Sequence, residues 1–545
     1  MTTRFGNFLS CIFNCHTESR ISLVLFFLTP LILYSGMAPL RDLYGIEARN
    51  ALFAREMLEN GISFVPQLMG RPYPDYPPLY FILEYLFSLP AGRVTTLSAV
   101  LPSALSAAGT VYLLWRWMSG TYEYLAAMAC MVLALSPGFY LKASHATVDM
   151  LLTFEATLAL YLLSRLWKGD DDINRRFVLM TATVLTLLAA FFTKGPVGIV
   201  IPLGGFGLYL LTERKWNRML RFSLFATACG ILLTGIYFMF IYLQGGWPLV
   251  SRVITSQITT RIGTEPNRPF YYYAVYLFTS FLPWWLLIAL LPKLMGRKAW
   301  TGAKSCVPTQ AAHFLAPSDR AACMDTVRIC AAGTSVTLSI FMMASSRHGR
   351  YLLPAFPLIA VLIAAGIRAI GTCNLRRYGH ITPNPRAALH TFHSLALTVS
   401  LTAAAMSAGL VLYSLFIEPG ISAAESGRRF MQEVDANTPP DVPMVIYRIN
   451  PDGNGIKLAL YSDRGTDRLK FPRTPDELGL VDSDDLVVIM YGNELDELPH
   501  PQGIRMRTVA TGTVHRKKII ALHLHRDPAE ELKRKNHNME SQLRP

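Results

Sequence analysis

Apolar segments of about twenty residues recur along most of this chain, and they leave few choices for its fold. About eleven such segments lie between residues 21 and 417. A run of about 20 apolar residues is long enough to cross the hydrocarbon core of a bilayer as a helix. Charged residues make up only 16% of the chain, against about 25% in ordinary soluble domains. The pattern predicts a mainly α, polytopic membrane protein.

The order of apolar and basic segments also predicts how the chain is oriented. Basic clusters follow alternate helices on the side of the N-terminus, and the positive-inside rule makes that side cytoplasmic. An odd number of spans then places the C-terminal region outside the membrane. The spans are expected near residues 21–37, 96–115, 122–141, 148–166, 177–193, 196–212, 221–243, 271–292, 327–344, 352–370 and 391–416.

Residues 38–94 are expected to form an external loop with two helices that lie along the membrane interface. One is amphipathic and is stopped by Gly61, and the other is too short to cross comfortably. Counting such segments as spans raises the total from about 11 to about 13. The first apolar run is expected to remain as a helix, because the sequence after it is a poor signal-peptidase site.

Residues 422–545 differ in composition and predict a small α/β domain without disulfides, since they contain no cysteine. A helix is expected over 425–435, and the charged tail after Asp527 is expected to be disordered. Strands are expected at 445–449, 458–462, 485–491 and 518–524, where apolar and β-branched residues lie between turn signals. The predicted domains are therefore 1–421, in the membrane, and 422–545, outside it.

The net charge of +14 comes from basic residues spread over many short loops. This distribution fits membrane topology and anionic headgroups better than a nucleic-acid surface. The chain has no Walker loop, dinucleotide fingerprint or GxSxG elbow. Its cysteines and histidines also lack the spacing of metal ligands. The candidate chemistry is therefore among acids and cations at the helix ends.

Four carboxylates lie in charged stretches that the span count places on the outer side of the membrane: Asp42, Glu47, Asp75 and Asp149. A carboxylate near a membrane helix is costly unless it faces water or a partner, so each is a functional candidate. Two structural alternatives stay open. Asp149 also fits a plain helix cap, and Glu47 fits an interfacial charge paired with Arg49 or Arg55.

Cations from four parts of the chain are predicted to reach the same face: Lys194, Arg261, Arg347 and Arg350. Lysine and arginine suit phosphate, and the planar fork of arginine can bind two of its oxygens. Taken singly, each also fits a side chain that snorkels to the interface. Together they favour a site for an anionic lipid-linked substrate.

The motifs in this region resemble those of bacterial glycosyltransferases that use polyprenyl-phosphate sugars. These enzymes belong to the superfamily of protein O-mannosyltransferases and lipid A aminoarabinose transferases. The resemblance covers roughly residues 20–370. The matching motifs, in order, are Glu47-Ala-Arg49, Ala54-Arg-Glu-Met-Leu58, Gly61, Val65-Pro66, Gly70-Arg-Pro-Tyr73, Asp75-Tyr-Pro-Pro-Leu-Tyr80, His145-x3-Asp149, Phe192-Thr-Lys-Gly195, Pro269-Phe-Tyr-Tyr-Tyr273, Leu282-Pro-Trp284 and Ser346-x3-Arg350-Tyr351-x2-Pro354.

The resemblance implies a GT-C helical bundle in the bacterial inner membrane, with a periplasmic C-terminal domain. It also implies an inverting transfer of a sugar from undecaprenyl phosphate to a membrane lipid, glycan or protein acceptor. Aminoarabinose and lipid A are one such pair. Asp42, Glu47 and Asp149 are the expected catalytic carboxylates. The expected substrate-binding residues are Arg49, Asp75, Tyr76, Lys194, Arg261, Arg347, Arg350 and Tyr351.

The chain departs from the family pattern at three positions. Ile46 stands where the family has the aspartate favoured as its base, and Tyr76 replaces a lysine of the third motif. Gln257 is the nearest match to a histidine that helps hold a metal in the lipid A branch. We therefore expect no required cofactor, with a divalent metal as a less favoured alternative. Protein O-glycosylation, a flippase and a non-catalytic lipid-binding protein remain as rival functions.

Overall fold

The structure is a computed structural model that describes residues 20–119, 123–167, 172–259, 268–294, 317–344, 347–379, 385–474, 477, 485–497 and 504–526. The chain forms two compact units. The first contains Met1–Met37, Pro74–Leu83 and Val100–Tyr413. The second contains Ala38–Tyr73, Glu84–Ala99 and Ser414–Pro545. The domain boundary at residue 421 stays a prediction, and the second unit also takes in two segments from the expected membrane domain.

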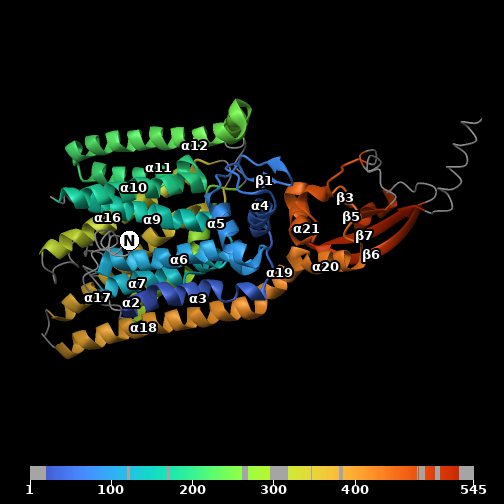
Figure 1. Cartoon of the computed structure of the whole chain (residues 1–545). Coiled ribbons are helices and arrows are strands. Elements are labelled where there is room, and N and C mark those ends of the chain that lie inside the picture. Colours follow the sequence, from blue (N-terminus) through green and yellow to red (C-terminus); the bar gives the residue numbers. More distant parts are fainter. Residues whose placement is uncertain are drawn as a thin grey trace, which may run out of the picture. The chain divides into compact units, whose positions relative to one another are not determined.

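The first unit is a bundle of helices. Each of the eleven predicted apolar segments is helical, and α10, α11 and α12 lie side by side (Figure 1). α5 (Leu79–Ser88) and α6 (Thr96–Ser119) carry residues of both units. The other helices are α2 (Arg20–Leu23), α3 (Thr29–Ser35), α7 (Glu123–Ala134), α8 (Pro137–Ala143), α9 (Val148–Leu166), α10 (Ile173–Lys194), α11 (Pro196–Thr212), α12 (Trp216–Thr259), α13 (Tyr272–Ser280), α14 (Leu282–Leu294), α16 (Pro317–Met342), η5 (Gly349–Ala355), α17 (Phe356–Gly379) and α18 (Pro385–Leu412).

Two of the predicted spans are sharply bent, which the apolar pattern did not indicate. α7 and α8 meet at 66°, and α13 meets the first part of α14 at 81°. Pro137 opens α8, and Pro283 is the second residue of α14. Proline lacks the amide hydrogen that helix continuation needs but fits the first turn of a new helix. A third break lies inside α12, where Gly245 and Gly246 have non-helical backbone angles.

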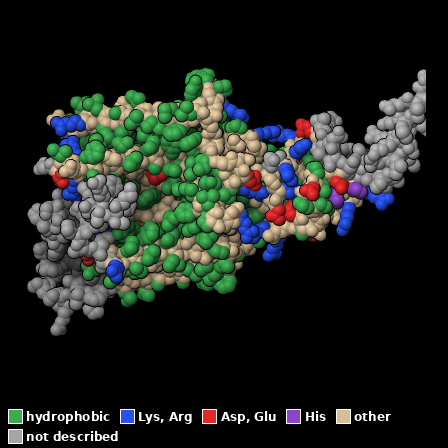
Figure 2. Space-filling view, viewed as in Figure 1, with side chains coloured by type: hydrophobic (Ala, Val, Ile, Leu, Met, Phe, Trp, Pro, Cys, Tyr) green, Lys and Arg blue, Asp and Glu red, His purple; other side chains and the backbone are tan. Residues whose placement is uncertain are grey.

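Within the described residues, six helices are long and apolar enough to cross a membrane, or up to eight if each bent pair is one span. The larger count of 11 to 13 spans therefore stays a prediction. Hydrophobic side chains cover much of the bundle face seen in Figure 2, as expected for a surface in contact with lipid tails.

The second unit combines short helices with a five-stranded sheet of order β4-β3-β5-β7-β6. β3 pairs in parallel with β4 and β5, while β7 pairs antiparallel with β5 and β6. Its elements are η2 (Ala38–Leu40), α4 (Ile46–Asn60), β1 (Gln67–Leu68), β2 (Arg71–Pro72), η3 (Leu89–Ala91), α19 (Glu418–Ser426), α20 (Arg428–Asn437), β3 (Met444–Ile446), η7 (Pro451–Gly455), α21 (Ile456–Tyr461), η8 (Thr466–Arg468), β4 (Leu469–Lys470), β5 (Asp485–Tyr491), η9 (Gly492–Glu497), β6 (Ile504–Val514) and β7 (Lys517–Arg526).

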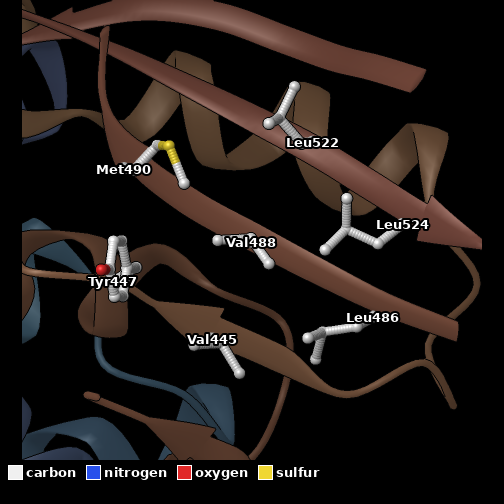
Figure 3. Packing of buried hydrophobic residues seen from close by; sticks show 7 residues of the cluster. All are labelled: Val445, Tyr447, Leu486, Val488, Met490, Leu522 and Leu524. Carbon is white, nitrogen blue, oxygen red and sulfur yellow. The ribbon is translucent and has the colours of Figure 1, made fainter. Parts of the chain in front are cut away.

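One face of this sheet forms a compact hydrophobic core (Figure 3). Alternate residues of a strand point to the same face, so each strand contributes every second side chain. The cluster consists of Val445, Tyr447, Leu486, Val488, Met490, Leu522 and Leu524.

The structure confirms part of the secondary structure predicted for this region. The strands expected at 485–491 and 518–524 are β5 and β7. The strand expected at 458–462 is wrong, because these residues belong mainly to helix α21. The helix expected over 425–435 is divided at Gly427, which has a left-handed φ of 73° and separates α19 from α20. The tail after Asp527 lies outside the described residues.

Candidate active site

Asp149 and Lys194 form a buried ion pair in the first unit. Asp149 lies in the first turn of α9, where the positive end of the helix dipole favours a carboxylate. Lys194 is the last residue of α10. Only 5% of the Asp149 side chain and 10% of the Lys194 side chain are exposed. The carboxylate thus has a specific partner, which a plain helix cap would not need.

Arg350 is the second cation at this carboxylate. Its Nε lies 3.5 Å from the Asp149 oxygen that does not bind Lys194. Tyr351 lies beside both cations: the Lys194 ammonium is 4.4 Å from the ring centroid, and the Arg350 guanidinium carbon is 5.4 Å away. The ring also stacks on Phe341. An aromatic face attracts cations, so Tyr351 helps to hold both of them in place.

The ends of the helices are fixed by local interactions that the sequence supplies. Gly195 adopts φ 66°, a left-handed value that ends α10 directly after Lys194, and Pro196 then starts α11. At the start of α9, the Thr147 amide donates to Ser103 Oγ at 2.9 Å, and Ser103 Oγ donates to the Thr147 carbonyl at 3.1 Å. These contacts set the positions of both ion-pair partners.

The group has two cations and one carboxylate, so it carries a net positive charge. The ring of His348 lies near this group. Burial, and then the charges of Arg350 and Arg268, lower the pKa of His348 below its usual value. His348 is therefore neutral at pH 7. A buried site with excess positive charge and several N–H donors is suited to a phosphate.

A cavity of about 230 Å³ opens beside Lys194. Asp75 lies on its wall, and the rest of the lining is largely apolar. Tyr237 and Phe238 come from the first part of α12, while Val253 and Ile254 follow the glycine break at 245–246. The break thus lets one helix contribute to the cavity twice. Apolar walls with a lysine at one side match the chemistry of an isoprenoid phosphate.

Of the other predicted residues in this unit, Tyr76 lies close enough to Arg350 to interact with its charge. Arg347 is directed elsewhere, since its guanidinium donates to the Arg268 carbonyl at 2.7 Å and to the Met342 carbonyl at 3.3 Å. Arg261 lies outside the described residues. The structure therefore groups Asp149, Lys194, Arg350 and Tyr351, with Asp75 on the adjoining cavity.

Asp42, Glu47 and Arg49 belong to the second unit. The two carboxylate oxygens of Asp42 accept hydrogen bonds from Ser426 Oγ at 2.9 Å and from Arg428 at 3.0 Å. Arg49 donates to the Tyr73 hydroxyl at 3.2 Å, and its guanidinium carbon is 5.6 Å from the centroid of that ring. The Asp42 contacts join the first segment of this unit to residues 426–428, and the Arg49 contact lies within that first segment.

Glu47 is bound by Arg41, a residue that the sequence did not single out. Two hydrogen bonds of 2.7 Å join the Arg41 guanidinium to both oxygens of Glu47, and Glu418 lies 3.3 Å from Arg41 Nε. Burial opposes the charge of Arg41, but the two glutamates outweigh it and raise its pKa above the usual value. Glu47 is thus paired, as the structural alternative expected, and its hydrogen-bond partner here is Arg41.

Glu155 is a second residue of this kind that the sequence alone did not indicate. It is buried in α9, and one of its oxygens accepts a hydrogen bond of 2.9 Å from Thr193, the neighbour of Lys194. An acid in the middle of the apolar run 148–166 was the available signal, because ionisable groups in membrane helices are rarely accidental. Asp149 and Glu155 thus both bind the C-terminal end of α10.

The residues present do not fit a bound metal. Among the described residues, no three histidine, cysteine, aspartate or glutamate side chains are grouped so that they could hold an ion. Both oxygens of Asp149 are already engaged by cations. Since metal ligands must be available and deprotonated, no step below depends on a metal.

Comparison with known proteins shows which families this chain is similar to. Residues 75–242 match the family described as dolichyl-phosphate-mannose-protein mannosyltransferase. The structure of ArnT from Cupriavidus metallidurans bound to undecaprenyl phosphate superimposes with a TM-score of 0.69 at 17% identity, covering 92% of this chain and 98% of that one. The chain is similar in sequence to protein mannosyltransferases and aminoarabinose transferases. Its fold is that of the ArnT structure.

Two curated proteins show how far the sequence similarity extends. An undecaprenyl phosphate-α-4-amino-4-deoxy-L-arabinose arabinosyl transferase of Edwardsiella ictaluri is 25% identical over 59% of this chain and 55% of its own length. The corresponding protein of Pectobacterium carotovorum is 25% identical over 74% of this chain and 67% of its own length. The chain spans about half the length of the first curated relatives that it matches.

Proposed function

We propose that this protein is an inverting glycosyltransferase of the bacterial inner membrane. It moves a sugar from undecaprenyl phosphate to an acceptor at the periplasmic face, where the second unit also lies. The observation that carries the proposal is the net positive group formed by Asp149, Lys194 and Arg350 beside a cavity with apolar walls. Aminoarabinose as the sugar and lipid A as the acceptor are the finer assignment that the curated relatives favour.

The proposed chemistry is a single displacement. An acceptor oxygen attacks the anomeric carbon, the bond from that carbon to the phosphate oxygen breaks, and its electron pair leaves with the lipid phosphate. Lys194 and Arg350 stabilise the charge that develops on this phosphate. Asp149 is a positioning residue, because it holds both cations in the absence of donor and yields them to the phosphate when donor binds.

Among the candidate carboxylates, Asp75 is the one that lines the cavity with Lys194. We assign to it the proton of a hydroxyl acceptor, since a general base must lie close to the group that it deprotonates. A phosphate acceptor is already ionised near pH 7 and needs no such base. The assignment to Asp75 also fits the presence of Ile46 at the position where the family has its favoured base, because the base then comes from another part of the chain.

The test is a transfer assay with the full-length protein in proteoliposomes that contain undecaprenyl-phosphate aminoarabinose and lipid A. The expected products are free undecaprenyl phosphate and modified lipid A, both measured by mass spectrometry. Arg350→Ala should abolish both. Movement of the donor between leaflets without a new glycosidic bond would instead support a flippase. Donor binding without turnover in the wild type would support a non-catalytic protein, and either result would overturn the proposal.

A further inference from the structure

The second unit contains a larger and more polar pocket, of about 740 Å³. Its lining comes from three separate segments: residues 39–59, which include most of α4, residues 92–97 at the start of α6, and the region of α20 and α21. Ligand pockets commonly have volumes of about 300 to 1,000 Å³. None of the residues proposed for sugar transfer lines this pocket.

The walls of the pocket are fixed by hydrogen bonds within the unit. Arg55 of α4 donates to the carbonyls of Ala459, Leu460 and Ser462, at 2.9, 3.1 and 2.7 Å, at the end of α21. The Tyr461 hydroxyl accepts from the Leu43 amide at 2.6 Å and donates to the Leu43 carbonyl at 3.0 Å. Such contacts fix the positions of these segments relative to one another, so the pocket is already formed before any ligand binds.

The turn at 92–97 is anchored in the same way. Thr95 and Ser98 exchange backbone-to-side-chain hydrogen bonds of 2.9 and 3.1 Å, which fixes the start of α6. Thr96 Oγ1 donates to the Arg41 carbonyl at 3.0 Å. Arg93 therefore projects from a constrained turn.

Three polar side chains of the lining are not used by the fold. Among the residues that the structure describes, no side-chain hydrogen bond or ion pair engages Arg93, Gln432 or Asp463. By contrast, Arg55 is paired with Glu59 at 2.7 Å, and Arg428 is paired with Asp42 at 3.0 Å. The pocket thus presents donors on Arg93 and Gln432 and acceptors on Gln432 and Asp463.

The chemistry of the lining indicates the class of ligand. The charges of Arg93 and Asp463 balance, as do those of the two internal ion pairs, so a polyanion gains little net attraction. Hydroxyl groups both donate and accept, and they match a wall that offers both functions. Tyr461 and the side chains of Leu43, Leu58 and Leu460 supply apolar surface for the C–H faces of sugar rings.

We propose that this pocket binds a saccharide, namely the carbohydrate part of the acceptor. The identification of this saccharide as part of the acceptor rests on the proposed function. Saccharide binding by the pocket does not depend on it. Arg93 and Gln432 donate hydrogen bonds to the sugar hydroxyls, and Asp463 accepts from them. The pocket then serves to select acceptors by their glycan, separately from the group that handles the donor phosphate.

The experiment uses the full-length protein in nanodiscs and, as the probe, the deacylated saccharide fraction of the host's lipopolysaccharide. Saturation-transfer NMR should show binding of sugar protons to the wild type. Arg93→Ala and Gln432→Ala should each weaken it about fivefold, as expected for loss of one or two hydrogen bonds. Arg429→Ala and Glu433→Ala, which change exposed neighbours outside the pocket, are matched controls and should bind as the wild type does.

Three results would overturn the saccharide pocket: no binding to the wild type, equal binding by all variants, or binding that disappears when the probe is dephosphorylated. The last result would indicate an anion site. Asp149→Asn separates this proposal from the transfer reaction, because it should lose donor turnover and keep saccharide binding. Saccharide binding by a wild type without transferase activity would refute the proposed function and leave the pocket standing.

Discussion

Lys194 and Asp149 form a buried ion pair although 45 residues separate them in the chain. The pair joins the last residue of α10 to the first turn of α9, and Arg350 adds a second cation from η5. One carboxylate cannot neutralise two cations. The remaining positive charge is therefore available to a phosphate, and this is the basis of the predictions for the first unit.

Lys194→Ala should reduce release of undecaprenyl phosphate by about 100-fold or more, because loss of one group that stabilises developing charge commonly costs about 10² to 10³ in kcat. Lys194→Arg should recover part of the activity, since it keeps the charge with a different shape. Lys215→Ala, which alters a partly exposed lysine paired with Glu213, is the control. Activity of Lys194→Ala within twofold of the wild type would exclude the proposed role.

Asp149→Asn should destabilise the first unit by about 3 kcal/mol, because it leaves two buried cations without their counter-ion. The double variant Asp149→Asn/Lys194→Gln should recover part of this loss, since it also removes one of those cations. Thermal unfolding in detergent provides the measurement. If both variants melt at the temperature of the wild type, the ion pair does not contribute to stability.

Asp75→Asn should discriminate between two kinds of acceptor. With a hydroxyl acceptor, loss of the base should slow transfer by about 10² to 10⁴. With a phosphate acceptor, which is ionised near pH 7, the change should be small. Initial rates on matched hydroxyl and phosphate acceptors give the comparison. Equal losses on both would show that Asp75 does not accept the proton.

These predictions also show what the sequence could supply. The eleven apolar segments and the motifs around Asp149, Lys194 and Arg350 were visible as patterns. Their pairing was not, because no local rule relates residues so far apart in the chain. Arg41 was missed partly for the same reason: one of its partners, Glu418, comes from a distant segment, while the other, Glu47, is six residues away.

The errors in the second unit have local causes. Residues 456–461 form a short apolar run, and a run of this length fits either a strand or a helix; leucine, alanine and lysine then favour α21. β6 was not predicted; it is an edge strand in which residues 505–508, Met506 among them, are exposed, and it contains a register shift between Thr508 and Ala510. Edge strands often lack the apolar alternation on which such predictions depend.

Glu47→Gln should lower the melting temperature clearly, while its effect on the catalytic rate should be small. The glutamine keeps one acceptor but gives up the charge-assisted pair with Arg41, which is worth about 1.5 to 3 kcal/mol. Activity per folded molecule should fall less than about tenfold, against 10² to 10⁴ for loss of a general base. Glu433→Gln, at an exposed position of α20, serves as the control. A loss of about 1,000-fold without a change in stability would instead make Glu47 catalytic.

Glu59 should make the second unit sensitive to acid. Burial opposes ionisation of its carboxyl, but hydrogen bonds from Thr466 and Arg55 outweigh this and lower its pKa. A lowered pKa stabilises the fold above the unfolded-state value of about 4.3, and this contribution is lost as the pH falls through the folded-state pKa. Melting temperatures from pH 7 to pH 3 should fall less steeply for Glu59→Gln. Parallel curves would contradict the assignment.

Arg55 and Tyr461 have a consequence for engineering this protein. Arg55 donates hydrogen bonds to carbonyls of residues 459–464, and Tyr461 binds the backbone of Leu43. A truncation at residue 414 would remove these hydrogen-bond partners of Leu43 and Arg55, so the C-terminal part cannot be deleted without exposing the segment that it contacts. Chimeras built from two relatives should therefore exchange residues 38–73 together with everything from 414 onward.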